Sequence, residues 1–211
     1  MFDIILIFQL VILIFSVMIH EIAHGSVANS LGDPTAKNEG RLTLNPLKHI
    51  DIFGSIILPL LLLLSSVFSG GSGIIFGWAK PVPVNPLRFK DQKWGSLKVA
   101  IAGPASNFIL AIFFGLVIRF SNLPIESSFL QFLTIIVFYN LSLGLFNLIP
   151  IPPLDGSHIL LNIFPIRSRG IMMFLQQYGF IILIFLVFSG GLSFLSIILR
   201  WLFVLLTGIG L

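Results

Sequence analysis

Six long apolar stretches limit the folds available to this chain more than any other feature. They cover about residues 4–31, 52–67, 97–120, 129–149, 171–188 and 192–206. A helix needs roughly 20 apolar residues to cross the hydrocarbon layer of a bilayer, and most of these stretches approach or exceed that length. Since 56% of the residues are hydrophobic and only 9% are charged, a soluble fold could not bury the apolar surface. The sequence therefore predicts an all-α polytopic membrane protein with five to six transmembrane segments.

The second stretch, residues 52–67, is short and carries Pro59, which removes a backbone donor and kinks a helix. Most Lys and Arg residues lie in three loops, one on either side of this stretch and one between the fourth and fifth stretches. Cytoplasmic loops carry an excess of basic residues. Three cytoplasmic loops place the N-terminus outside and the C-terminus inside, provided that residues 52–67 re-enter on one side. The alternative is an ordinary sixth span, which would leave five basic residues outside.

The chain has no internal repeat, appended soluble domain or low-complexity linker, so we expect one intramembrane domain over residues 1–211. Its core is expected at about residues 4–164, followed by a C-terminal helical pair at about 171–207. The net charge of +4 reflects basic loops beside a bilayer rather than nucleic-acid binding. Cysteine is absent, so any metal ion must be held by His, Asp or Glu.

Residues 76–85 differ from the apolar stretches around them and read Phe-Gly-Trp-Ala-Lys-Pro-Val-Pro-Val-Asn. Alternating Val and Pro cannot form a helix, so this segment is predicted to be extended chain or an edge strand. Such a small β element at the membrane rim would carry unpaired backbone groups, which are costly near hydrocarbon. An extended partner peptide could pair with them by strand addition.

The first apolar stretch contains the motif His20-Glu-Ile-Ala-His24. Two His residues at i and i+4 lie on one face of a helix, where both imidazoles can reach one metal ion. Glu21 lies between them and could act as general base towards a metal-bound water. A chance match is the alternative, but ionisable residues inside a membrane span are costly, rare and usually functional.

A catalytic zinc site needs a third protein ligand. Asp155 is the first candidate, because it follows the fourth stretch in the segment Asn-Leu-Ile-Pro-Ile-Pro-Pro-Leu-Asp-Gly. His158 and His49 are the rivals. In the predicted topology the fourth stretch ends inside, as the first does, so Asp155 approaches the two His residues from the same side. If residues 52–67 spanned the membrane, Asp155 would start from the opposite side.

Together these motifs resemble the site-2 protease family of intramembrane zinc metalloproteases, peptidase family M50. The resemblance covers most of the chain and rests on residues 20–25, 77–85, 103–107 and 147–156. It implies that His20, His24 and Asp155 ligate one Zn²⁺ and that Glu21 is the catalytic base. It also implies hydrolysis of transmembrane or membrane-tethered substrates, near the cytoplasmic side of a bacterial cell membrane. The chain is too short for the PDZ or CBS module of longer members, and neither its substrate nor its oligomeric state is predicted.

Asn107 and Asn147 are polar residues in apolar surroundings. They either form interhelical hydrogen bonds or support substrate binding or the transition state, and the resemblance favours a supporting role.

Two other classes of protein stay open as alternatives to a protease. A zinc-binding membrane protein that sequesters single-span partners would not need Glu21. A transporter would place His and Asp along an ion path and usually has repeated halves. Two His and one carboxylate also suit non-haem iron, although Glu21 favours zinc.

Overall fold

The computed structural model describes residues 2–51, 80–121, 123–124, 126–163 and 169–210. The described residues form helices and connecting segments and contain no strand. The helices are α1 (Phe2–Ser30), α2 (Thr35–Asn38), α4 (Gln92–Phe120), α5 (Ser128–Asn147), α6 (Asp155–Ile163), α7 (Arg169–Phe188) and α8 (Ser193–Thr207). Two one-turn 3-10 helices, η1 (Pro46–Lys48) and η3 (Pro86–Arg88), lie in the connections.

Four of the described helices are long and apolar enough to cross a membrane. These spans are Ile4–Ser30, Trp94–Phe120, Ser128–Asn147 and Gly170–Phe188. Helix α8 is also apolar but has only 15 residues. The prediction of an all-α polytopic membrane protein is therefore confirmed. The predicted re-entrant stretch, residues 52–67, lies outside the described residues.

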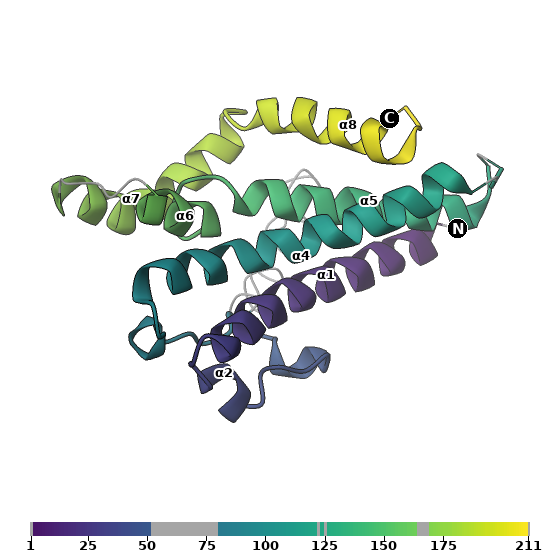
Figure 1. Ribbon diagram of the computed structural model, residues 1–211. Coiled ribbons are helices and arrows are strands. Elements are labelled where there is room, and N and C mark those ends of the chain that lie inside the picture. The colour runs from purple at the N-terminus through teal and green to yellow at the C-terminus, as the bar shows by residue number, and fades with distance from the viewer. Residues whose placement is uncertain (1, 52–79, 122, 125, 164–168, 211) are drawn as a thin grey trace.

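Helix α4 is the central element and packs against α1, α5, α6 and α8. Figure 1 shows α1, α4 and α5 running side by side along the bundle. The main apolar cluster joins α4, α5 and α8 and consists of Ala111, Ile118, Leu130, Leu133, Val137, Leu141 and Phe203. Side chains on the outside of the bundle are apolar too: Ile4, Ile7 and Phe113 are 61%, 60% and 60% exposed. Such a surface suits a helix bundle surrounded by lipid.

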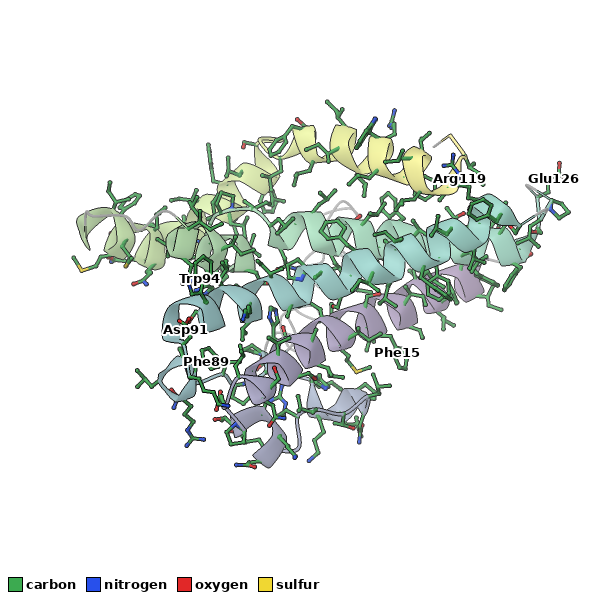
Figure 2. All side chains as sticks on the ribbon, in the orientation of Figure 1. Phe15, Phe89, Asp91, Trp94, Arg119 and Glu126 are labelled. Atoms are coloured by element: carbon green, nitrogen blue, oxygen red, sulfur yellow. The ribbon has the colours of Figure 1, made fainter. Side chains whose placement is uncertain are left out.

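The C-terminal helices differ from the expected arrangement. We expected the two chain ends on opposite sides of the membrane, but Figure 1 places both at the same end of the bundle. There Arg119, near the end of α4, donates from Nη1 to the carbonyl oxygen of Leu205, and Leu206 packs beside Gly115. Figure 2 shows Arg119 at the end of the bundle away from Trp94. Helices α7 and α8 follow one another without folding back, because α8 packs on α4 and α5.

The segment predicted to be extended chain or an edge strand forms no strand in its described part. Residues 80–85, which we call the strap, contain neither helix nor strand. The Lys80 amide donates to the carbonyl oxygen of His49 at 2.9 Å. The buried Arg41 donates from Nη2 to the carbonyl oxygens of Lys80 and Pro81, at 2.8 and 3.2 Å. The strap is thus held by specific contacts rather than by sheet pairing, and residues 76–79 lie outside the described part of the chain.

Candidate active site

Helix α1 presents two buried imidazoles on one face. His20 and His24 are only 6% and 8% exposed, and their Nε2 atoms lie 3.1 Å apart. The i, i+4 spacing puts the two side chains one turn apart, as the sequence predicts. Both Nε2 atoms therefore face one small volume between α1 and its neighbours.

Asp155 completes the cluster from α6. Its Oδ2 atom lies 3.0 Å from His20 Nε2 and 3.3 Å from His24 Nε2. Asp155 is the first residue of α6, which begins after the proline-rich turn that follows α5. A side chain at Gly156 would overlap the carbonyl oxygens of Leu148 and Ile149, so glycine allows the turn to close tightly enough to place Asp155.

The two rival histidines lie elsewhere. His158 is exposed on α6. His49 is buried, and its Nε2 atom lies 2.9 Å from the carbonyl oxygen of Thr43. Among the described residues, the one group of at least three His, Cys, Asp or Glu side chains able to share a metal ion is His20, His24 and Asp155.

The hydrogen bonds of the two imidazoles determine where their protons lie. His24 Nδ1 is 2.7 Å from the carbonyl oxygen of Val99, which can only accept, so Nδ1 carries the hydrogen. His20 Nδ1 is 2.7 Å from Asn107 Oδ1, whose amide nitrogen is engaged elsewhere, so Nδ1 donates here as well. In a neutral imidazole only one nitrogen carries a hydrogen, so both Nε2 atoms then carry no hydrogen and present a lone pair. This is why the buried Asp155 Oδ2 has no hydrogen-bond donor although two nitrogens lie close to it.

The lone pairs of His20 Nε2, His24 Nε2 and Asp155 Oδ2 point towards one another with no hydrogen between them. They repel one another unless a cation lies between them. Zn²⁺ binds His nitrogen at about 2.0–2.1 Å, which puts neighbouring ligands of a tetrahedral site about 3.3 Å apart. The ligand atoms of His20, His24 and Asp155 are separated by 3.0, 3.1 and 3.3 Å. Both the donor set and its spacing therefore fit Zn²⁺, with one coordination position left for water or substrate.

Glu21 lies beside this cluster and contacts the strap. Its Oε2 atom accepts a hydrogen bond from the Val82 amide at 2.7 Å. The side chain is only partly buried, unlike its two histidine neighbours. A carboxylate therefore lies next to the candidate metal cluster and is oriented by a backbone donor.

Comparisons with known proteins agree with this geometry. The sequence profile of peptidase family M50 matches residues 121–189. The chain is 42% identical over 186 residues to a Bacillus subtilis protein named "Putative zinc metalloprotease YwhC", covering 85% of this chain and 79% of that protein. The chain belongs to peptidase family M50. It is therefore a zinc metalloprotease of the site-2 protease family.

More distant relatives carry similar names. "Putative zinc metalloprotease Rip2" of Mycolicibacterium smegmatis is 30% identical over 193 residues, which is 89% of this chain and 67% of that protein. "Zinc metalloprotease MJ0392" of Methanocaldococcus jannaschii is 37% identical over 81 residues, covering 37% of this chain and 23% of the relative. No solved structure shows a significant match to the chain.

In this M50 protease, a buried network of polar side chains contacts His20 at Nδ1, the ring nitrogen that is not part of the candidate metal cluster. Asn107, which has no exposed surface, accepts from His20 and donates from Nδ2 to Asn140 Oδ1 at 3.0 Å. Asn140 in turn donates to Ser16 Oγ at 3.0 Å. The network joins α1, α4 and α5, and it gives Asn107 a contact with His20 rather than an open face for substrate. Asn140 and Ser16 are not among the residues predicted from the sequence, although an Asn inside an apolar span is itself a signal.

Asn147 is placed differently. It ends α5 and donates from Nδ2 to the carbonyl oxygen of Leu143 in its own helix at 3.0 Å. This contact does not join Asn147 to the histidine cluster, and a supporting role for its side chain stays a prediction.

Gly103 makes room for the two imidazoles. A Cβ atom at this position in α4 would overlap His24 Nε2 and lie only 2.5 Å from His20 Nε2. Any larger residue would fill the space in which the ligand atoms meet. The segment 103–107 of this protease thus contributes both the space for the cluster, at Gly103, and the support of His20, at Asn107.

Asp33 holds the far end of the strap. This fully buried carboxylate accepts from the Asn85 amide at 2.6 Å and from the Thr35 amide at 3.1 Å. Arg88 Nη1 lies 3.8 Å from it. Burial disfavours the charged form, but the hydrogen bonds from Asn85 and Thr35 and the charge of Arg88 outweigh it and lower the pKa of Asp33. The charged form of Asp33 is therefore the one that ties the strap to the end of α1.

Proposed function

We propose that this M50 protease hydrolyses peptide bonds in transmembrane or membrane-tethered substrates. His20, His24 and Asp155 hold one Zn²⁺, and Glu21 is the catalytic base. The proposal rests on the convergence of three buried ligand atoms within 3.3 Å of one another. They meet inside a bundle of membrane-type helices and directly beside a carboxylate.

The side chains divide the chemistry between them. When bound, Zn²⁺ supplies a Lewis acid that polarises a carbonyl oxygen and lowers the pKa of a water molecule. Glu21 accepts the proton of the attacking water and passes it to the amine that leaves when the peptide C–N bond breaks. Asn107 and the Val99 carbonyl keep the imidazole protons on Nδ1, so that both Nε2 atoms stay available as ligands.

A helical substrate must unwind locally before its scissile carbonyl can be attacked, because helical carbonyls are engaged in backbone hydrogen bonds. We propose that the unwound segment pairs with residues 82–85 of the strap. The amides of Val82 and Asn85 already donate to Glu21 and Asp33, and Pro83 has no amide. Within residues 82–85, the pairing would therefore use the Val84 amide as donor to a substrate carbonyl and the strap carbonyl oxygens as acceptors of substrate amides.

The distribution of charge supports a location for the site at one side of the membrane. Basic residues gather at the end of the bundle where α1 ends and α4 begins, and include Lys37, Lys48, Arg88 and Lys90. The connection between α4 and α5, residues 121–127, contains no Lys or Arg. The positive-inside tendency therefore supports a site towards the cytoplasmic side of a bacterial cell membrane. We also propose that residues 1–211 act as a single intramembrane protease domain.

The second candidate is a zinc-binding membrane protein that sequesters single-span partners without cleaving them. Nothing in such a role requires a carboxylate held beside the metal ligands. The hydrogen bond that orients Glu21 at 2.7 Å from the Val82 amide therefore favours the protease.

The test is cleavage of a single-span substrate in phospholipid vesicles by the full chain and by Glu21→Gln. We expect the variant to retain zinc and substrate binding but to lose cleavage, because its amide cannot accept a proton. Glu39→Gln, an exposed glutamate at the end of α2, is the matched control and should cleave normally. Cleavage by Glu21→Gln at the rate of the unmodified chain would refute the role of Glu21.

A further inference from the structure

The strap approaches Glu21 through a single backbone donor. Pro81 and Pro83 flank Val82, and proline has no amide hydrogen. The Val82 N–H is therefore the sole backbone donor among residues 81–83, and it donates to Glu21 Oε2 at 2.7 Å. The two prolines also restrict the chain to extended conformations at this point. The donor is thus presented by a stiff segment.

The absence of a side chain at Gly25 in α1 lets the strap approach the helix closely. Gly25 lies one helical turn after Glu21 and so on the same face. A Cβ atom at Gly25 would lie 2.8 Å from Val82 Cγ1 and 2.6 Å from Leu42 Cδ2, closer than side chains pack. Glycine at this position is therefore what allows Val82, which is 7% exposed, to rest against α1.

The strap is held at both ends around this donor. Before Val82, the Arg41 guanidinium binds the carbonyl oxygens of Lys80 and Pro81. After it, the Asn85 amide is bound by Asp33. Arg41 and Asp33 are both buried, at 4% and 0% exposure. Anchors on both sides fix where the Val82 amide lies relative to α1.

We propose that the backbone amide of Val82 is a positioning group for catalysis: it holds one oxygen of Glu21, so that the other oxygen is directed to the attacking water. The inference rests on the proposed role of Glu21 as base. Catalytic groups must be held within about 0.5 Å of the productive geometry, and a glutamate side chain on a helix is otherwise free to change rotamer. The strap therefore belongs to the catalytic machinery through its main chain rather than through its side chains.

The decisive variant replaces Val82 by α-hydroxyvaline, which turns the amide into an ester and removes the N–H while keeping the side chain. A misplacement of about 1 Å can cost about 100-fold in rate, so we expect kcat to fall about 10- to 100-fold. The KM and the zinc content should not change. The matched control is the same replacement at Trp94, whose amide donates to Asp91 Oδ1 at 3.1 Å at the start of α4, and it should leave kcat unchanged.

A second variant separates the amide from the side chain. Val82→Ala keeps the N–H, so we expect its kcat to lie close to that of the unmodified chain. A fall in kcat as large as that of the ester would overturn the proposal, because packing rather than the amide would then position Glu21. A rise in KM with unchanged kcat in the ester protein would also overturn it, since the amide would then bind substrate.

Hydrogen exchange gives a readout that does not depend on activity. Residues 80–85 contain only four amides, because two positions are proline. In Glu21→Ala, we expect the Val82 amide to exchange faster, while the amides of Lys80 and Asn85 keep their protection. Unchanged exchange of the Val82 amide in Glu21→Ala would overturn the positioning role of this amide but not the proposed function. A normal kcat in the ester protein would have the same consequence. In the cleavage assay with phospholipid vesicles, normal cleavage by Glu21→Gln would instead overturn the proposed function.

Discussion

His20 Nδ1 and Asn107 Oδ1 lie 2.7 Å apart, although 87 residues separate them in the chain. The contact fixes which nitrogen of His20 carries the proton, and it links the candidate metal cluster to α4 and α5. Outer partners of metal-binding histidines typically change metal affinity by about 10- to 100-fold when they are removed.

Asn107→Ala should therefore weaken zinc binding by about 10- to 100-fold. The substitution removes the acceptor of the His20 Nδ1–H and leaves Asn140 Oδ1 without the donor that Asn107 supplies. Competition with a chelator of known affinity measures the change. Asn38→Ala, at an exposed asparagine in α2, is the control. Equal zinc affinity in both variants would show that the contact does not support the metal.

Gly103→Ala should remove zinc without unfolding the bundle. The added Cβ would occupy the space in which the Nε2 atoms of His20 and His24 meet, so the imidazoles would have to turn away. We expect a zinc content near zero together with helical circular dichroism like that of the unmodified chain. Gly210→Ala, where a Cβ meets nothing within 4 Å, should keep its zinc. Full zinc occupancy in Gly103→Ala would contradict the described geometry.

Removal of zinc should lower the thermal stability of the protein, because the ligand atoms of His20, His24 and Asp155 then face one another without a cation. Zinc at 100 times its Kd stabilises a folded protein by about 2.7 kcal/mol. For a chain of this size that corresponds to a Tm change of about 5–10 °C. Differential scanning fluorimetry in detergent, with and without chelator, measures it.

His24→Ala should abolish the response of the Tm to zinc, whereas His158→Ala should keep it, because His158 is exposed on α6 and outside the cluster. A zinc response in His24→Ala equal to that of the unmodified chain would place the ion elsewhere.

The attachment of the strap at Asp33 should weaken in acid. The folded protein lowers the pKa of Asp33 below the value of about 3.9 for an unfolded chain. The ionised carboxylate thus stabilises the folded strap fully above about pH 4, and this contribution is lost as the pH falls through the lowered value. Hydrogen exchange of the Asn85 amide, corrected for the intrinsic effect of pH, should show constant protection near neutrality and declining protection below about pH 4.

Asp33→Asn should show less protection at Asn85 near neutrality and no such decline, because an amide side chain cannot be protonated in this range. Asp91→Asn, which changes the cap of α4 instead, should retain the pH dependence. A decline that persists in Asp33→Asn would assign the effect to another group.

Much of the candidate site can be located from the sequence because ionisable residues are costly in hydrocarbon and therefore rare in membrane-spanning helices. His20, Glu21 and His24 stand out in an apolar helix, and the i, i+4 spacing of the two histidines already implies that they share a face. Asp155 stands out for the same reason, and the structure brings its Oδ2 to within 3.0 Å of His20 Nε2. Asn140 carries the same kind of signal, but an asparagine alone does not reveal which helix it contacts.

The path of the C-terminal helices was not predictable in the same way. Ser189–Leu192 looks like the turn of a helical hairpin, yet α8 continues along the bundle and ends beside Arg119. Short glycine-containing connections permit either course. Packing of α8 against α4 and α5 decides between them, and that packing depends on surfaces far apart in the chain.

The sequence by itself determined that this protein is a helical membrane protein and that His20 and His24 share one face of an apolar helix, because periodicity and the cost of charge in hydrocarbon are local properties. The structure selected Asp155 over His158 and His49 as the third member of the candidate metal cluster. Only the tertiary structure decided which imidazole nitrogens are free, what supports His20, and that the main chain of Val82 meets Glu21. Those features depend on hydrogen bonds between distant segments. A backbone amide has no side-chain identity, so no residue pattern could have revealed its role.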